Sequence, residues 1–443
     1  QGRVMRISPA HALLLLAPFA HANEALDVLE GKIDANSVVL PPPPYKEGAE
    51  GEAGEEEVGE LIYLEPEWAP SPLDSIWSRS VLYDSTANPW VQQVAITGYF
   101  DFQGSFGQAE TDASGLTPAR NTDLDGTRTR RARLGARIRA FNNTEIEAIG
   151  EFAGSDEYSG IERLKAYTQL SDTTGITYGK FRPNFGTESR TEQQLSPYFN
   201  RTATTDMFAP ASSLGVSIHH AGKDFDYDVG WFSGDYSADL PSVEGDGFLN
   251  LSISRTTVEK NGDSLARVRW HADYIHNFDP GNTNPAGYNL AGQLSANGAQ
   301  FVQNPAYRHL FSTGFAIDSD RYAVTADFQL AKGNTTAWGL SLGGSYWVMP
   351  GTLKLVGRYQ YAGTDDARAI VTTFGNSGGL RYDDSPFFTG DEYHSFYLGA
   401  NLHLYKDGLI LRNGLEYSIL NDDVGNSFNT EAFTWRTGAS ISF

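Results

Sequence analysis

Residues 128–141 read RTRRARLGARIRAF, and this stretch carries the strongest fold signal in the chain. From Arg131 to Ala140, arginine or glycine alternates with alanine, leucine or isoleucine. Successive side chains of a β-strand point to opposite faces, so the pattern predicts a strand with one charged face and one apolar face. Charged side chains are almost never buried unless they are paired. The charged face must therefore meet water or opposite charges, while the apolar face meets a hydrophobic environment.

The same period of two continues from residue 91 to residue 443. We predict sixteen strands, at 91–104, 127–142, 144–153, 161–172, 175–182, 212–221, 225–234, 247–257, 264–277, 308–318, 321–331, 335–348, 352–362, 391–404, 408–420 and 431–443. An even number of antiparallel strands is typical of an outer-membrane barrel.

The connections between these strands alternate in length. One set is short, for example Asn142-Asn143 and Lys406-Asp407, and the other set is mostly long, at 105–126, 154–160, 183–211, 235–246, 278–307, 363–390 and 421–430; 332–334 is the exception. Transmembrane barrels have tight periplasmic turns and longer outer loops. The predicted fold is therefore all-β, a sixteen-stranded antiparallel transmembrane β-barrel over residues 91–443 with an acidic, mostly disordered N-terminal extension.

The amino-terminal residues predict export from the cytoplasm. Met5-Arg6 is followed by the apolar run Ala12–Phe19 and by Ala20-His21-Ala22, which matches the A-x-A pattern of a signal-peptidase site. We expect residues 1–22 to be a signal peptide that is cleaved after Ala22. The expected location is the outer membrane of a Gram-negative type of cell.

Residues 23–90 form a predicted periplasmic linker. They hold fifteen acidic residues against Lys32, Lys46 and Arg79, a net charge of −12. Such a Pro- and Gly-rich acidic segment cannot bury a core. Short helices are predicted at 24–36 and Leu73–Tyr83. The linker is either a solvated spacer or a docking segment for a basic periplasmic or peptidoglycan-associated partner.

Composition excludes several classes of protein. The chain has no cysteine, so it has no disulfide, thiolate metal site or lipid-carrying cysteine. Its net charge of −22 argues against nucleic-acid binding. His219 and His220 are adjacent on a strand and point to opposite faces, so they do not form a metal site. We predict no cofactor, no metal site and no enzymatic activity.

The charged faces of the strands are expected to line a lumen, because a charge facing lipid costs about 2–4 kcal/mol at mid-depth. The inward basic residues would be Arg131, Arg133, Arg137, Arg139, Arg163, Lys165, Lys180, Arg182, Arg267, Arg269, Lys354, Arg358, Arg412 and Arg436. The inward acidic residues would be Asp101, Glu145, Glu147, Glu151, Asp226, Asp228, Asp273, Asp327 and Glu416. The surplus of basic residues predicts preference for anions. Cross-strand ion pairs could instead cancel most of this field.

The segments RTRRARLGARIRAF (128–141), ITYGKFRPNFG (176–186), SPYFNRTATTDMFAP (196–210) and LGVSIHH (214–220) resemble the phosphate-selective porin O/P family. The resemblance implies a homotrimeric barrel in which loop 183–211 folds inward as a constriction. It further implies that Arg190 and Arg201 contact anionic solutes there, with Arg182 beside them. The loop departs from the family because it also carries Glu188, Glu192 and Asp206.

The leading hypothesis is a porin for passive diffusion of small hydrophilic solutes, with a preference for phosphate-like or carboxylate anions. Its partners would be outer-membrane lipid and lipopolysaccharide, two further copies of the chain, and the anionic solutes. Two alternatives remain open. One is a non-selective general porin, and the other is an envelope tether or adhesin that works through its acidic N-terminal segment.

Overall fold

The computed structural model describes residues 71, 73–113, 120–152, 160–233, 247–261, 264–278, 307–333, 335–365, 370–372, 388–422 and 428–443. The expected signal peptide and most of the expected linker lie outside the described residues. So do most residues of loops 235–246 and 278–307. In the described part of the chain, no helix is long and apolar enough to cross a bilayer.

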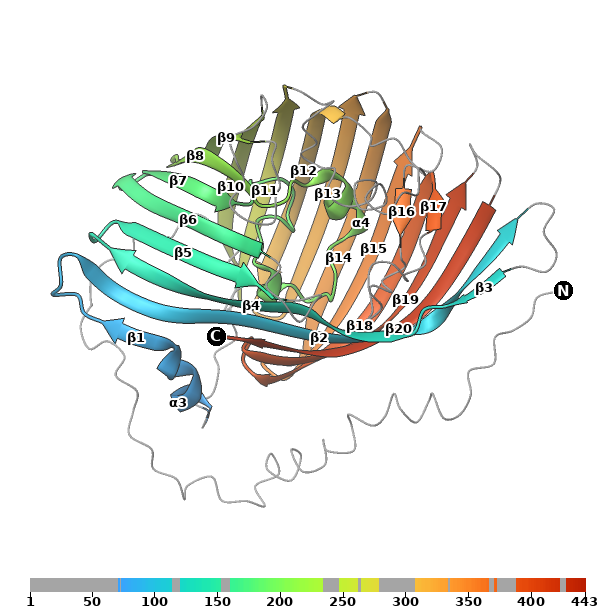
Figure 1. The fold of residues 1–443 in the computed structure, drawn as a ribbon, viewed down its shortest axis with the longest axis horizontal. Helices are drawn as coiled ribbons and strands as arrows, with labels where there is room; N and C mark the ends of the chain where they lie inside the picture. The colour runs from blue at the N-terminus through green and yellow to red at the C-terminus, as the bar shows by residue number, and fades with distance from the viewer. Residues whose placement is uncertain are drawn as a thin grey trace, which may run out of the picture. The chain divides into compact units, whose positions relative to one another are not determined.

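Sixteen described strands form one closed antiparallel β-barrel (Figure 1). Each strand pairs with the next along the chain, and β20 closes the barrel by pairing with β2. The strands are β2 (Val91–Ala113), β4 (Gly126–Ala140), β5 (Thr144–Glu151), β6 (Gly160–Ser171), β7 (Thr174–Phe181), β8 (Ser213–Ala221), β9 (Asp226–Phe232), β10 (Phe248–Asn261), β11 (Ser264–Asn277), β12 (Tyr307–Ser319), β13 (Tyr322–Gly333), β14 (Thr336–Met349), β15 (Leu353–Thr364), β18 (Glu392–Tyr405), β19 (Leu409–Asp422) and β20 (Phe428–Ser442). The predicted fold class is confirmed.

The main difference from the predicted strands is at β2, which continues nine residues beyond the expected end at residue 104. Its extension pairs with β20 up to Ala113↔Phe428, and the short strand β3 (Arg120–Asp123) pairs with it as well. A second short hairpin, β16 (Ile370–Thr372) and β17 (Phe388–Gly390), lies within the expected loop 363–390. The extension of β2 reads SFGQAETDA and has no large apolar residue after Phe106, so hydrophobic periodicity does not reveal its last seven residues.

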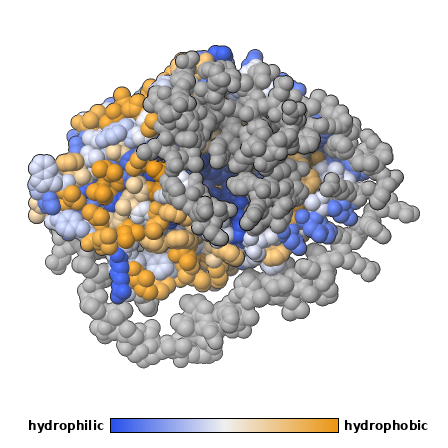
Figure 2. Space-filling model, viewed as in Figure 1, coloured by the Kyte–Doolittle hydropathy of each residue, from blue (hydrophilic) through white to orange (hydrophobic). Residues whose placement is uncertain are grey.

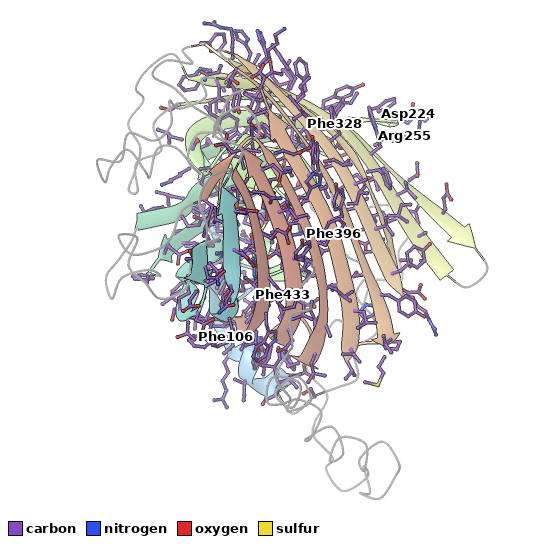
Figure 3. All side chains as sticks on the ribbon, turned by 90° about the vertical axis from the view of Figure 1, so that its right-hand side faces the viewer. Phe106, Asp224, Arg255, Phe328, Phe396 and Phe433 are labelled. Atoms are coloured by element: carbon purple, nitrogen blue, oxygen red, sulfur yellow. The ribbon has the colours of Figure 1, made fainter. Side chains whose placement is uncertain are left out.

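The two faces of the wall differ as expected for a barrel in a membrane. On β2, Asp101 is 1% exposed on the inner face and Phe102 is 53% exposed on the outer face. The outer face carries exposed aromatic residues on many strands, among them Phe106, Phe328 and Phe396 (Figure 3). Hydrophilic residues line the hollow at the centre of Figure 2. The chain thus turns its apolar surface outward and its charges inward.

A β-bulge in β4 changes which arginines face the lumen. Arg131 pairs with Asp101, but Thr129 pairs with Phe102, so Arg130 is an extra residue without a partner on β2. A bulge shifts the alternation by one residue. Arg128 consequently stands opposite the inward-facing Gln103.

The residues just before the barrel are folded. The predicted helix Leu73–Tyr83 is shorter than expected: α3 (Asp74–Trp77) and the 3₁₀ turn η3 (Ser78–Ser80) lead into β1 (Val81–Asp84), which pairs with β2. The Trp77 indole nitrogen donates to the Ser442 carbonyl at 2.5 Å. Asp74 accepts from the Tyr405 hydroxyl at 2.6 Å and pairs with Lys406 at 2.9 Å. These contacts fasten the segment to the turn between β18 and β19 and to the end of β20.

Candidate functional site

The segment between β7 and β8 lies inside the barrel and contacts several parts of its wall. On one side, both Glu192 carboxylate oxygens accept from the Arg163 guanidinium of β6, at 2.7 and 2.9 Å. On another side, Arg412 of β19 donates to the Ser196 carbonyl at 3.0 Å. The expected constriction loop, 183–211, therefore crosses the lumen (Figure 1).

A buried network holds the first turn of this loop. The backbone N–H of Gly186 donates to Asp273 at 2.8 Å, and Gly186 has a φ of +77°, which favours glycine. The Thr187 hydroxyl donates to Asp327 at 3.0 Å, and His271 lies 2.9 Å from each of these two carboxylates. Imidazolium has a donor on each ring nitrogen, so this arrangement fits a charged His271.

A further anchor joins the second half of the loop to the opposite strands. Glu188 accepts from the Thr202 hydroxyl at 2.8 Å and from Arg358 of β15 at 3.3 Å. Thr202 also caps the short helix α4 (Ala203–Phe208), since its side chain accepts from the N–H of Thr205. Phe208 at the end of α4 is fully buried in an apolar cluster.

The structure places Arg190 in the same anchor rather than at an open surface. Its guanidinium pairs with Asp273 of β11 and donates to the Ser252 hydroxyl of β10 at 2.6 Å. The expectation that Arg190 contacts solute is therefore not met, because its charge is already neutralised by a buried carboxylate.

Most of the predicted basic ladder is ion-paired. Each of its arginines on β4 and β6, and Lys165, has a carboxylate within 4.0 Å: Arg131 with Asp101, Arg133 with Glu151 and Glu162, Arg137 with Glu145 and Glu147, Arg139 with Glu145, and Arg163 and Lys165 with Glu147. Glu162 is inserted by a second irregularity, between Arg163 and Ile161 of β6. This part of the wall is held together by opposite charges, as the neutralisation alternative proposed.

Three other predicted ladder residues lie elsewhere. Lys180 pairs with Leu164 and Leu214 near the end of β7 and is only 5% exposed, directly after Gly179, whose φ of +116° interrupts the regular strand. Arg267 and Arg269 face inward on β11 towards the end opposite the long loops, where Arg269 donates to the Thr256 hydroxyl at 3.3 Å.

Three arginines in or next to the loop differ from the basic ladder in their distance from carboxylates. Arg130, Arg182 and Arg201 have no carboxylate within 4.0 Å among the described residues, although Arg201 donates to Gln193 at 2.9 Å. Burial and the nearby Arg201 lower the pKa of Arg182 to about 9. Burial raises the pKa of Asp206, while Arg130, Arg201 and Arg182 act in the opposite direction. We call Arg130, Arg182 and Arg201 the arginine cluster.

Sequence reasoning identifies Arg182 and Arg201 but not Arg130. Strict alternation from Arg131 puts Arg130 on the lipid face, and only the bulge turns it inward. The sequence does contain a signal for the bulge. Arginines at 128, 130 and 131 cannot all face inward in a regular strand, and an arginine that faces lipid is costly.

A cavity of about 50 Å³ lies between the loop and β13 to β15. Arg201, Arg358 and Glu188 line it, together with hydroxyl groups that include those of Thr202, Tyr198 and Ser341. Charged and hydroxyl side chains together favour polar solutes or water in this cavity.

The chain is similar in structure to the outer membrane channel DcaP of Acinetobacter baumannii, at 15% identity and a TM-score of 0.48, over 82% of this chain and 99% of that one. It is also similar to an anion-selective porin from Comamonas acidovorans, at 12% identity and a TM-score of 0.46, over 79% and 99% of the two chains. A third similar structure is OprB of Pseudomonas putida, at 12% identity and a TM-score of 0.46, over 78% of this chain and 94% of that one.

No protein-family model matches the sequence, and no curated protein matches it either. Only helices and closed barrels satisfy all their backbone hydrogen bonds inside a bilayer. A closed sixteen-stranded antiparallel barrel with an apolar outer face and a charged lumen is the architecture of bacterial outer-membrane channels. The chain is an outer-membrane β-barrel of sixteen antiparallel strands.

Proposed function

We propose that the chain is a passive diffusion channel that prefers small anions such as phosphate-like or carboxylate solutes. The observation that carries this proposal is the arginine cluster beside the inward loop. Its guanidiniums have no carboxylate within 4.0 Å in the described part of the chain; Asp206 acts on all three from a greater distance, Glu162 on Arg182 and Arg201, and Glu188 on Arg201. Anions entering such a site meet a positive potential, whereas cations are repelled.

The cluster, rather than the ladder, is the proposed selectivity element. Paired arginines such as Arg131 and Arg133 present little net charge to a solute, because a carboxylate within 3.1 Å of each cancels most of their field. Unpaired charges in a narrow, low-dielectric passage act more strongly than the same charges in water. Selectivity thus depends on three residues out of many basic ones.

We propose no catalytic step. Thr187, His271 and Asp273 have the residue types of a nucleophile, a base and an orienting acid, and the Thr187 hydroxyl lies 3.1 Å from His271. However, that hydroxyl donates to Asp327, and all of these side chains are nearly fully buried. Their hydrogen bonds hold the first turn of the loop against β11 and β13, and we assign them this structural role.

We further propose that residues 1–22 are a signal peptide cleaved after Ala22, and that the acidic segment before α3 is a periplasmic spacer. N-terminal sequencing of protein purified from membranes tests the first point, with Asn23 as the expected first residue. A start at any residue before Ala20 would contradict it.

Planar-bilayer recording tests the proposed function. Purified full-length protein should form open channels in KCl, and inorganic phosphate should reduce the chloride current at millimolar concentration. The double variant R182Q/R201Q should still conduct but lose the block by phosphate. Channels without block would indicate a general porin. Absence of conductance, also in a variant lacking residues 23–72, would contradict the channel proposal and favour the tether.

A further inference from the structure

The cavity between the inward loop and β13 to β15 contains buried donors that lack partners. Its volume is about 50 Å³, and two of its lining residues, Gln193 of the 3₁₀ turn η4 (Gln193–Leu195) and Arg358 of β15, are 5% and 7% exposed. Among the described residues, the Gln193 Nε2 and Arg358 Nε atoms have no hydrogen-bond partner. A buried donor without an acceptor is costly, so this pair points to a bound group that the chain itself does not supply.

Other contacts of the same two side chains hold them in place. The Gln193 Oε1 atom accepts from Arg201 Nε at 2.9 Å, so the other end of this amide is the NH₂ group. The Arg358 guanidinium donates through Nη1 to the Asn200 carbonyl at 2.7 Å, and it lies 4.5 Å from the centre of the Tyr198 ring. Neither side chain can turn away to find another acceptor without losing these contacts. The missing partner is therefore an acceptor located at the cavity.

The charged residues that line the cavity leave one positive charge in excess. Arg358 pairs with Glu188 at 3.3 Å, and Asp327 lies 2.9 Å from His271. Arg201 has no carboxylate within 4.0 Å in the described part of the chain, and more distant carboxylates weaken its field without pairing with it. A buried charge is costly unless an opposite charge accompanies it. A monoanion suits this balance, whereas a dianion would bring a second negative charge next to Glu188 and Asp327.

The size of the cavity and the rest of its lining restrict the ligand further. One water molecule needs about 10–15 Å³ of such space, so this cavity holds about four non-hydrogen atoms. Pro197 and Ala323 add apolar surface to the lining, and Thr325 and Ser341 add hydroxyl groups. A carboxylate that carries a single methyl group matches this volume, this charge and this mixture of polar and apolar surface.

We propose that this cavity binds a small monocarboxylate of the size of acetate, between the inward loop and the wall of the barrel. The carboxylate oxygens accept from Gln193 and Arg358, next to the charge of Arg201. The bound anion thereby joins the loop to β15. This inference goes beyond channel function and holds whether or not the lumen selects anions. Of the arginine cluster, Arg201 alone lines the cavity in the described part of the chain.

The first experiment is equilibrium dialysis of radiolabelled acetate against the full-length protein in detergent. Wild type should bind about one acetate per chain, saturably. Q193E keeps the acceptor for Arg201 but replaces the free donor with a carboxylate oxygen, so its affinity for acetate should fall at least tenfold. Q103E is the matched control, because Gln103 is equally buried but does not line the cavity, and it should bind as wild type does. Absence of saturable binding to wild type, or an equal loss in Q193E and Q103E, would overturn the proposal.

Two further variants separate this cavity from the arginine cluster without adding a charge. S341V fills part of the cavity and should also weaken acetate binding at least tenfold, whereas R182Q alters the cluster but not the cavity and should bind acetate as wild type does. The heat-dependent shift in gel mobility shows that each barrel is folded. Loss of binding in R182Q together with normal binding in S341V would place the acetate at the cluster. That result would overturn this inference and leave the proposed function intact.

Discussion

Arg137 lies within 3.5 Å of Glu145 and Glu147, whereas Arg182 has no carboxylate within 4.0 Å in the described part of the chain. The strand pattern predicts both arginines as members of one basic ladder. The residues differ because Arg137 faces the glutamates of the neighbouring strand β5, while Arg182 follows the end of β7 and faces the loop. Whether an arginine has a carboxylate partner depends on the register of the strands and on the path of the loop. Neither can be predicted from the composition or from the period of two.

The first prediction concerns net charge in the passage. R182Q should lower the anion-to-cation permeability ratio, because one charge at about 7 Å in water changes the local free energy of an anion by about 0.6 kcal/mol, or about threefold in concentration. The paired change R137Q/E145Q removes one charge of each sign and should leave the ratio unchanged. Reversal potentials in a KCl gradient measure both. An equal loss in the two variants would refute the distinction between ladder and cluster.

The second prediction concerns the ion pair between the loop and β6. E192Q removes the carboxylate that accepts twice from Arg163, although Glu147 still pairs with Arg163. We expect a higher anion preference and noisier open-channel current, because the loop loses a charged anchor and the lumen gains net positive charge. Single-channel recording checks both; a shift towards cations would contradict this role of Glu192.

The sequence predicts the strands better than their ends. The sixteen strands follow from alternation, and most boundaries agree within a few residues. Two bulges are not predicted, at Arg130 and Glu162, and each turns an extra charged residue into the lumen. A bulge is a local change of register that depends on the partner strand, so a single strand's sequence indicates it only indirectly.

The third prediction belongs to the segment α3–η3, which is fastened to the barrel by Trp77 and Asp74. The Trp77 ring lies 4.4 Å from that of Tyr405. W77A should release the segment and speed tryptic cleavage after Arg79 by about tenfold. W90A is the matched control, since Trp90 is largely exposed and should leave cleavage unchanged. Unchanged cleavage in W77A would show that the indole does not hold the segment.

The same segment has a defined pH dependence, which is the fourth prediction. Hydrogen bonding to Lys406, the Ser71 backbone and Tyr405 lowers the pKa of Asp74 to about 2. A lowered carboxyl pKa stabilises the docked state above the ordinary value, and this contribution is lost as the pH falls towards 2. Amide hydrogen exchange at residues 73–80, corrected for intrinsic rates, should show equal protection at pH 7 and pH 4. Loss of protection by pH 4 would contradict the assignment.

For the molecule as a whole, the inside-out distribution of side chains is the feature that the sequence determines most directly. The period of two predicts Phe102 on the outer face and Asp101 on the inner face, and the barrel confirms both. The height of the wall is harder to predict from the sequence. The expected ends of β5 and β7 lie one or two residues from the observed ends. The shortness of these strands has a meaning only in comparison with a membrane of fixed thickness.

The fifth prediction tests the depth of the barrel in the bilayer. Leu398 lies near the middle of β18 and Leu404 near its end, and both point outward. L398R should reduce the free energy of unfolding by about 2–4 kcal/mol, and L404R by about 0–1 kcal/mol, because the cost of a charge depends on its depth in the bilayer. Guanidinium unfolding from phospholipid vesicles gives both values. A larger loss for L404R would place the membrane elsewhere on the barrel.

Anion preference of this barrel is expected to come from three arginines beside an inward loop. The reversal potential of wild type and of R130Q/R182Q/R201Q, recorded across a KCl gradient in a planar bilayer, tests this dependence. We predict that the wild-type reversal potential has the sign of the chloride equilibrium potential. The triple variant should still form open channels, and its reversal potential should move to zero or take the opposite sign. A wild-type potential at zero, or a triple variant that keeps the wild-type potential, would show that the arginine cluster does not select anions.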